Sequence, residues 1–160
     1  SMALVHKNLY EAEDLSRINL KKYIDDLVVS LLSSFWISEN KIKYISEMDD
    51  VCVLIDTAIP CGLIMNELVT NTFKHAFPGD DTGSMSILLK KTEENEIIIK
   101  VSDTGIGLPE DFNMYLDGKL GISNIILLSE HQLKGTIKFF REKGLSSEIR
   151  FTDTLYNPRV

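Results

Sequence analysis

The residues best suited to chemistry lie on one face of a predicted helix near the middle of the chain, which reads NELVTNTFKHA over residues 66–76. At about 100° per residue, Glu67, Asn71 and Lys74 fall within an arc of about 60°. A carboxylate, an amide and an ammonium on one face could serve a ligand site, or they could form an ordinary solvated surface. Helix statistics alone favour the solvated surface, so a second site is needed to choose between these interpretations.

That second site follows a predicted buried strand, where the chain reads DTGIGLP from Asp103 to Pro109. A carboxylate at the end of the strand is followed by Gly105 and Gly107, which let the backbone approach a ligand closely. Asp and Gly are also common turn formers, so this motif alone is weak evidence. Its value depends on whether the fold brings it to the polar helix face.

Hydrophobic periodicity predicts the elements that must position these two sites. Helices are expected over residues 20–36, from near Asp56 to about Ala76, and over 121–133, with an extended stretch over 15–20. Strands are expected over 42–48, 51–55, 84–92, 96–102, 136–141 and 147–152, with the long irregular segment 103–119 between the two hairpins. Because hairpins force mostly antiparallel pairing, this order predicts an α+β fold: a two-layer α/β sandwich whose mixed, mostly antiparallel sheet is covered on one face by helices.

Composition limits the function classes. The 160 residues suit one domain, and 17 Lys plus Arg against 24 Asp plus Glu give a net charge of −7 without a basic stripe. General nucleic-acid binding is therefore disfavoured, although a local pocket for a small anion remains possible. No apolar run reaches the roughly 18 residues of a membrane span, and Cys52 and Cys61 lack zinc-site spacing, so reduced structural cysteines are expected.

Taken together, the two motifs resemble the ATP-binding domain shared by sensor histidine kinases, DNA gyrase, Hsp90-type chaperones and MutL proteins. NELVTNTFKHAFP resembles the N box, DTGIGLP the first glycine box, and Leu120-Gly121-Ile122 a remnant of the second. The N box is most similar to that of histidine kinases with an NELVTN sequence. Residues 2–20 resemble the tail of the dimerisation and phosphoacceptor helices of that group. The resemblance implies the Bergerat ATP-binding fold and covers nearly the whole chain.

The resemblance also implies roles for individual residues. Asp103 would accept a hydrogen bond from the exocyclic amine of adenine, beside Gly105 and Gly107. An ionised carboxylate only accepts, so it selects adenine over the keto oxygen of guanine. Asn71 would be the single protein ligand to Mg²⁺. The phosphates of ATP would meet Lys74, His75 and the amides after Gly121.

Glu67 is the candidate catalytic residue, with two roles open. In ATPases of the superfamily the equivalent glutamate activates water, whereas the acceptor in the kinases is a histidine whose neutral imidazole is already nucleophilic. Glu67 would then orient the acceptor or accept a proton.

The sequence departs from the family pattern in the second glycine box and the ATP lid, both of which are short. Ser146-Ser147 stands where the family usually has Gly-Thr, so Ser147 is expected to replace the threonine hydroxyl near adenine. Phe112, Met114 and Tyr115 in the lid are expected to contact the base or the partner helix, or else to pack on the domain. Trp36, at the end of the first helix, is expected in the core.

The resulting hypothesis is the catalytic domain of a two-component sensor histidine kinase, which transfers the γ-phosphoryl of Mg-ATP to a histidine on a separate helical domain. That histidine is expected outside this chain, since His6 falls in the tail-like stretch, and the fragment alone is not expected to autophosphorylate. The alternative is a regulatory nucleotide-binding module such as an anti-sigma-factor serine kinase. A gyrase-like or chaperone ATPase is less favoured because those proteins have a longer glycine-rich lid.

The domain organisation follows from the same hypothesis. Residues 1–19 are expected to hold a tag remnant, the helical tail and a linker, and residues 20–156 the catalytic domain. The expected partners are ATP, the dimerisation and phosphoacceptor domain of the same protein and, indirectly, a response regulator. The fragment is expected to be cytoplasmic and not inserted in a membrane, and the sequence leaves membrane anchoring of the parent protein open.

Overall fold

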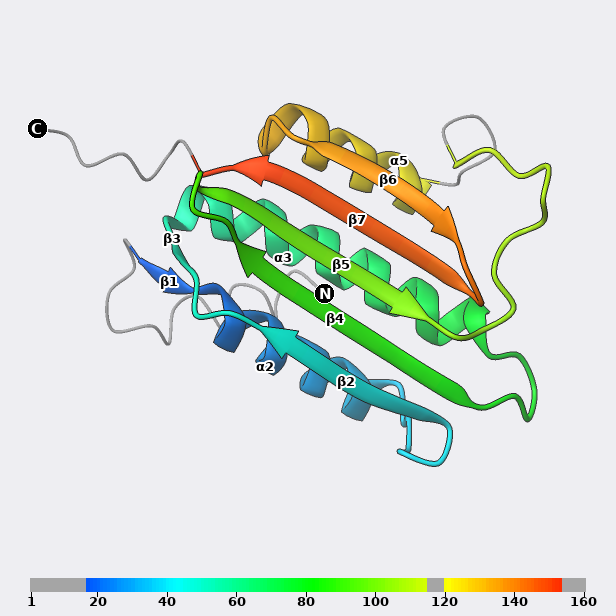
Figure 1. The fold of residues 1–160 in the computed structure, drawn as a ribbon. Helices are drawn as coiled ribbons and strands as arrows, with labels where there is room; N and C mark the ends of the chain where they lie inside the picture. Colours follow the sequence, from blue (N-terminus) through cyan, green and yellow to red (C-terminus); the bar gives the residue numbers. More distant parts are fainter. Residues whose placement is uncertain (1–16, 115–119, 154–160) are drawn as a thin grey trace, which may run out of the picture.

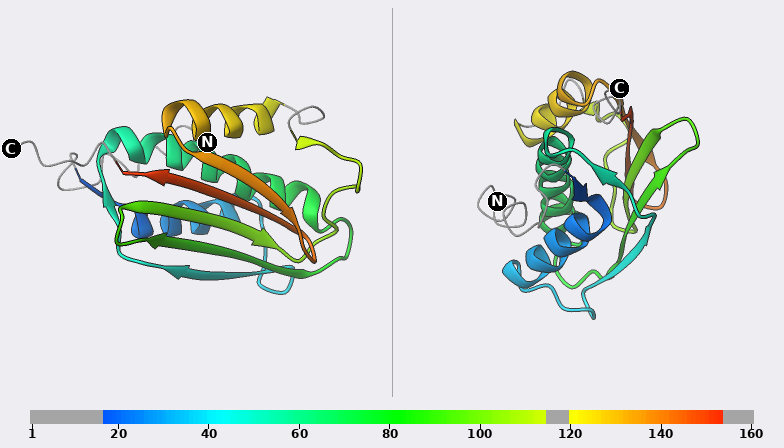
Figure 2. Two further views of the ribbon diagram at one scale, coloured as in Figure 1. Left: turned by 45° about the horizontal axis from the view of Figure 1, so that its top comes forward. Right: turned by 90° about the vertical axis from the view of Figure 1, so that its left-hand side faces the viewer.

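The computed structural model describes residues 17–114 and 120–153 and consists of two layers. One layer is a five-stranded sheet in the order β2-β4-β5-β7-β6, and the helices lie side by side on one of its faces (Figures 1 and 2). The predicted α+β sandwich is therefore confirmed.

The sheet is antiparallel except at one edge. It consists of β2 (Ile42–Met48), β4 (Gly83–Lys91), β5 (Glu96–Asp103), β6 (Thr136–Arg141) and β7 (Leu145–Thr152). Strands β4 and β5 form the predicted central hairpin, and β6 and β7 form the closing one. Strand β2 pairs in parallel with β4, with Ile42 opposite Gly83. A parallel partner needs a crossover, which the helix between β2 and β4 provides.

In the described ranges, three helices cover the sheet, namely α2 (Leu20–Ser34), α3 (Ile55–Asn71) and α5 (Leu120–Leu127). The Asn19 side chain caps α2 by accepting a hydrogen bond from the Lys22 amide at 3.0 Å. Helices α3 and α5 each continue as one turn of π-helix, over Thr72–Ala76 and Leu128–Gln132. The predicted helix ends near Ala76 and Leu133 are thus confirmed, but the final turns have π geometry.

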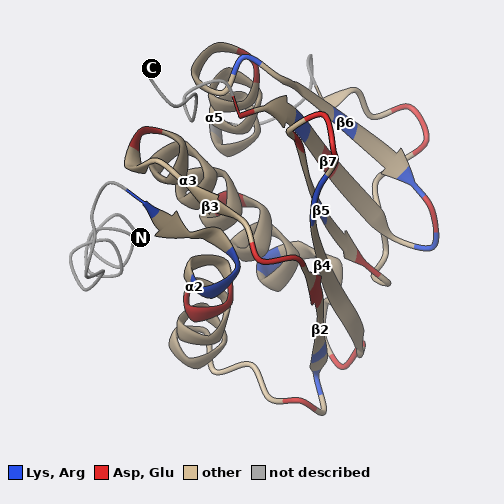
Figure 3. Cartoon of the chain, turned by 60° about the vertical axis from the view of Figure 1, so that its left-hand side comes forward, with Lys and Arg blue, Asp and Glu red and all other residues tan. Residues whose placement is uncertain are grey.

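The core lies between the layers and follows the alternation of the strands. The sheet contributes inward-facing residues at every second position, and α2 and α3 contribute apolar stripes. Fully buried examples are Met85, Ile87, Leu89, Ile97, Ile99, Ile24, Leu27, Ile64 and Met65. The opposite face of the sheet carries charges of both signs, including Arg150 paired with Glu96 and Glu148, and Figure 3 shows acidic and basic positions interspersed over the chain.

The strand expected over 51–55 needs correction. It is only β3 (Cys52–Val53), which pairs with β1 (Ile18–Asn19), while Ile55 already begins α3. Residues 15 and 16 of the expected extended stretch lie outside the described residues.

Trp36 is 93% exposed rather than in the core. Its φ of 56° places it in the left-handed region just after α2, which ends the helix and turns its side chain outward. Phe35 takes the packed position instead and meets Phe73 edge to face, with ring centroids 5.7 Å apart. Within the described residues, no helix combines the length and apolarity of a membrane span.

A buried hydroxyl generates a prediction about stability. Within the described part of the chain, Tyr23 Oη is buried without a hydrogen-bond partner, and it lies so close to Gly62 that a Cβ there would overlap it. This burial also raises the tyrosine pKa. Tyr23→Phe should therefore increase the free energy of unfolding by about 1 kcal/mol, measured by urea denaturation, because it removes an unsatisfied polar group.

Tyr44→Phe is the matched control, because the Tyr44 hydroxyl donates to Asp25 at 3.0 Å. This variant should lose about 0.5–1 kcal/mol. Equal losses in the two variants would contradict the interpretation of Tyr23.

Candidate functional site

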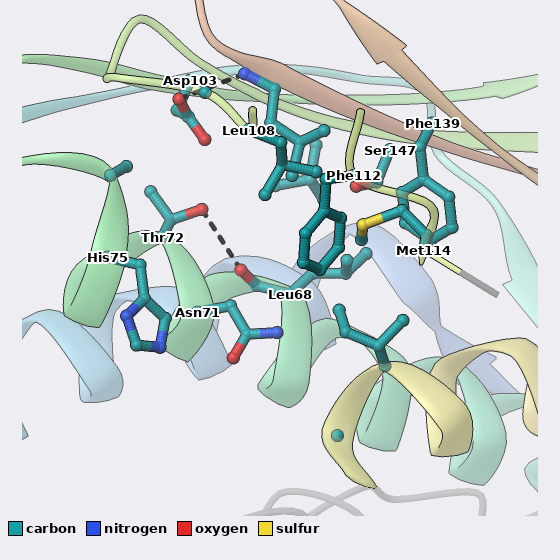
Figure 4. Close-up of a pocket in the computed structure, with 16 residues that line it drawn as sticks. Leu68, Asn71, Thr72, His75, Asp103, Leu108, Phe112, Met114, Phe139 and Ser147 are labelled. Atoms are coloured by element: carbon teal, nitrogen blue, oxygen red, sulfur yellow. Dashed lines mark hydrogen bonds between the residues drawn. The ribbon is translucent and has the colours of Figure 1, made fainter. Parts of the chain in front are cut away.

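A pocket of about 280 Å³ opens where the ends of α3 and β5 meet the segment that follows β5. Figure 4 shows Asp103 at one end of the pocket, with Asn71 and His75 on the helix across from it. The two sequence motifs therefore converge on a single site. Its lining comes from five parts of the chain: Leu68, Asn71, Thr72, His75 and Ala76; Val101 and Asp103; Gly107, Leu108, Phe112 and Met114; Gly121 and Ile122; and Phe139, Leu145 and Ser147.

Backbone amides from two segments hold the Asp103 carboxylate. Its Oδ1 accepts hydrogen bonds from the amide of Gly105 at 2.9 Å and from the amide of Leu145 at 3.3 Å. Its Oδ2 makes no hydrogen bond within the described part of the chain. Burial raises the pKa of Asp103, and the two backbone hydrogen bonds oppose this shift. The carboxylate is thus fixed in orientation and keeps one oxygen as an acceptor.

Gly144 also shapes this end of the pocket, although the sequence analysis placed it only in a hairpin turn. A Cβ at Gly144 would overlap the carboxylate and the carbonyl oxygen of Asp103. Any other residue would therefore displace Asp103. A glycine in a hairpin turn is so common that the sequence carried no signal of this contact.

The two glycines of the DTGIGLP motif occupy different places. Gly107 lines the pocket with a φ of 68°, in the left-handed region that favours glycine. Gly105 is not among the lining residues, because it packs against the carbonyl of Ala76 at the end of the π-helical turn. The adjacent amide of Ile106 donates to that carbonyl at 2.9 Å. Gly105 therefore joins the loop to the helix, while Gly107 faces the cavity.

The polar face of α3 is only partly directed into the pocket. Asn71 and His75 line it, whereas Glu67 and the exposed Lys74 do not. For Lys74, the π-helical turn starting at Thr72 explains the difference, because its i→i+5 bonds put more residues in each turn and change the angular positions after Asn71. The 3.6-residue period assumed from the sequence therefore misplaces Lys74. Glu67 precedes this turn and lies beside Gly121 instead.

Glu67 lies one helical turn before Asn71, beside the start of α5. A Cβ built on Gly121 would be 2.7 Å from Glu67 Oε2. The carboxylate is therefore next to a helix N-terminus, and Gly121 leaves it the necessary space. Gly121 itself lines the pocket.

Ser147 also faces the pocket, from β7. It is buried and pairs with Val101 in the sheet. The adjacent strand β6 contributes Phe139, opposite Ser147, which the sequence analysis did not single out. Its position two residues before the end of an edge strand gave no signal, because alternation fixes a face and not a neighbouring cavity.

Phe112 and Met114 of the segment after β5 close one side of the pocket (Figure 4). Both side chains therefore form part of the pocket wall. Tyr115 of the same segment, and Gly118, which is expected with Gly121 in the reduced second glycine box, fall in the undescribed range 115–119. Within the described ranges, no group of three or more His, Cys, Asp or Glu side chains is arranged to hold a metal ion. Among the residues that line the pocket, Asn71 carries a side-chain amide, and amide oxygens are suitable ligands for a hard cation.

Family comparisons match two parts of the chain. Residues 56–155 match the model of the histidine kinase-, DNA gyrase B-, and HSP90-like ATPases, and residues 1–35 match a histidine kinase model. The sensor histidine kinase PdtaS of Mycobacterium tuberculosis is 29% identical over 154 residues, 94% of this chain and 30% of that protein. Blue-light-activated histidine kinase 2 of Erythrobacter litoralis is 32% identical over 80 residues, 50% of this chain and 23% of that protein.

The fold has counterparts among solved structures. A histidine kinase domain of a blue-light-activated kinase from Erythrobacter litoralis superposes with a TM-score of 0.81 at 23% identity, over 94% of this chain and 70% of that chain. The Acinetobacter baumannii histidine kinase AdeS gives 0.70 at 15% identity, over 96% and 75%. The chain spans less than a third of the length of the curated relatives just described. The family match covers most of α3, most of the sheet and the pocket. This chain therefore belongs to the histidine kinase-, DNA gyrase B-, and HSP90-like ATPases and is a histidine kinase ATPase domain.

Proposed function

We propose that the pocket binds ATP with adenine at the Asp103 end and the phosphates toward Asn71 and the start of α5, and that the parent protein transfers the γ-phosphoryl to a histidine. The observation that carries the proposal is the convergence of a fixed carboxylate acceptor and an amide side chain on one cavity. Family membership supports the nucleotide, and the convergence supports its orientation.

Adenine fits the Asp103 end because of hydrogen-bond polarity. The exocyclic amine of adenine donates, and Asp103 Oδ2 is an acceptor without a partner in the described residues. Guanine presents a keto oxygen at the same position and would face the carboxylate with a second acceptor. Ser147, Leu108 and Phe139 provide a hydroxyl and apolar walls around the base.

The phosphates fit the opposite end because donors gather there. Gly121 lies at the start of α5, where free amides favour an anion. His75 lines the pocket, and Lys74 is an exposed cation on the same turn. Asn71 is our proposed single protein ligand to Mg²⁺, which would neutralise phosphate charge when bound.

Glu67 is proposed as the residue that orients or deprotonates the attacking group. Its carboxylate is beside Gly121 rather than in the pocket lining, next to the proposed phosphate end. Removing Asn71 should be more harmful than removing Glu67, because positioning and charge neutralisation contribute most to phosphoryl transfer.

The acceptor and partners are proposed from the family match. The match of residues 1–35 to a histidine kinase model favours a histidine acceptor over the serine of an anti-sigma-factor kinase. We propose that residues 1–19 belong to the helical tail and linker and residues 20–156 to the catalytic domain. The acceptor histidine would be in the separate dimerisation domain, and a response regulator would then receive the phosphoryl group. The domain itself would be cytoplasmic. The NELVTN-type subgroup is part of the same proposal.

Asp103→Asn tests the adenine assignment. The variant should bind ATP about 10- to 100-fold more weakly, because a charge-assisted hydrogen bond contributes about 1.5–3 kcal/mol. Calorimetry with ATP and GTP would also show the preference for ATP reduced. Asp50→Asn, an exposed acid remote in sequence from the pocket segments, is the control. Unchanged ATP affinity in Asp103→Asn would refute the assignment.

Asn71→Ala tests the metal assignment. ATP affinity should fall about tenfold or more when Mg²⁺ is present, because the variant lacks the protein's oxygen ligand. In EDTA, wild type and variant should bind ATP alike. A loss of the same size in both conditions would show that Asn71 contacts the nucleotide without acting through the cation.

The raised pKa of Asp103 predicts a pH dependence. As the pH falls through this pKa, Asp103 gains a proton and loses acceptor capacity, so ATP should dissociate more readily. The weakening should begin at a higher pH than for an ordinary aspartate of pKa about 3.9. Titrating the dissociation constant in wild type and Asp103→Asn checks this, because only the wild type should show this component.

A further inference from the structure

Arg141, the last residue of β6, contacts the segment that closes the pocket. Its Nη1 donates to the carbonyl of Glu110 at 2.6 Å, and its Nη2 donates to the carbonyl of Phe112 at 2.5 Å. The planar guanidinium presents donors in a fixed fork, so two hydrogen bonds define both the distance and the orientation of the bound backbone. Two carbonyls spaced two residues apart are therefore held at once.

The backbone that Arg141 holds carries part of the pocket wall. The Phe112 amide donates to the carbonyl of Pro109 at 3.0 Å, which forms a turn whose carbonyls at Glu110 and Phe112 face Arg141. The side chains of Phe112 and, two residues later, Met114 line the pocket (Figure 4). Fixing these carbonyls thus fixes the wall.

Nothing else in the described part of the chain accounts for the placement of Arg141. It is exposed and forms no ion pair within that part of the chain, and its neighbour Glu142 pairs with Lys100 at 3.7 Å. Arg150, on the adjacent strand, instead pairs with Glu96 and Glu148. The two arginines therefore differ in partner chemistry, since one binds carboxylates and the other binds backbone carbonyls.

The same hairpin also holds the opposite end of the pocket. Arg141 pairs with Leu145 across the β6–β7 turn, and the Leu145 amide donates to Asp103 Oδ1. Gly144, between them, packs against Asp103. One turn of five residues therefore positions both the polar end and the apolar wall.

We propose that Arg141 is a positioning residue for nucleotide binding, which holds residues 109–114 through the Glu110 and Phe112 carbonyls so that Phe112 and Met114 form the wall against the bound base. This inference rests on the proposed ATP site. Arg141 does not line the pocket, so it would affect the affinity for ATP through Phe112.

The test compares Arg141→Ala with Arg150→Ala in the 160-residue chain. ATP dissociation constants are measured by calorimetry. Arg141→Ala should weaken ATP binding about tenfold, since two hydrogen bonds no longer order the wall before binding. Arg141→Lys should recover only part of this loss. Its ammonium can still donate to a carbonyl, but it lacks the fork of paired donors that a guanidinium presents. Arg150→Ala should leave ATP affinity unchanged.

Two further readouts separate positioning from a general structural effect. Hydrogen exchange without nucleotide should be faster at residues 110–114 in Arg141→Ala, with the sheet amides unaffected. Combining Arg141→Ala with Phe112→Ala should weaken binding by less than the product of the single effects, because both changes remove the same contact.

The outcomes separate this inference from the proposed function. If the wild type does not bind ATP, the proposed function and this role fail together. If the wild type binds ATP and Arg141→Ala binds it equally well, only the role of Arg141 fails. Multiplicative effects in the double variant would also overturn it, because they would show that Arg141 does not act through Phe112.

Discussion

The site depends on one constraint, which is that the Asp103 carboxylate is held by backbone amides from both its own loop and a remote hairpin. The amides of Gly105 and Leu145 bind the same oxygen, and Gly144 leaves the space for them to do so. Backbone donors are fixed by the fold and lose little entropy on binding an anion, so they orient the carboxylate without a neighbouring positive charge. Its second oxygen is then presented to the cavity in a defined direction.

The two layers make this constraint possible by bringing distant segments to one end of the sheet. Because β5 is the central strand of the sheet, Asp103 at its end lies between α3 and β7. The antiparallel pairing of β5 with β7 places Ser147 opposite Val101. Burial of apolar residues between the layers supplies the stability that holds these ends together. The polar groups at the cavity therefore need not contribute to stability, and burial in fact penalises the charge on Asp103.

The β6–β7 hairpin contacts two separate parts of the pocket, the Asp103 end and the wall formed by the segment after β5. On one side its turn binds Asp103, and on the other Arg141 holds the carbonyls of Glu110 and Phe112. These lid contacts are exposed hydrogen bonds, which open at lower free energy than the core. One hairpin therefore holds both the polar end and the apolar wall of the pocket.

The sequence by itself determined the element types, the central hairpin and the two motifs that meet at the pocket, because these follow from local periodicity and turn chemistry. Only the tertiary structure decided the parallel pairing of β2, the outward turn of Trp36 and the contacts of Gly144 and Arg141. It also decided that His75 rather than Lys74 lines the cavity, through a π-helical turn that a 3.6-residue period does not describe. The physical reason is common to all of these features. Each depends on a backbone conformation or on a contact between segments far apart in the chain, and neither is specified by the residues on either side of it.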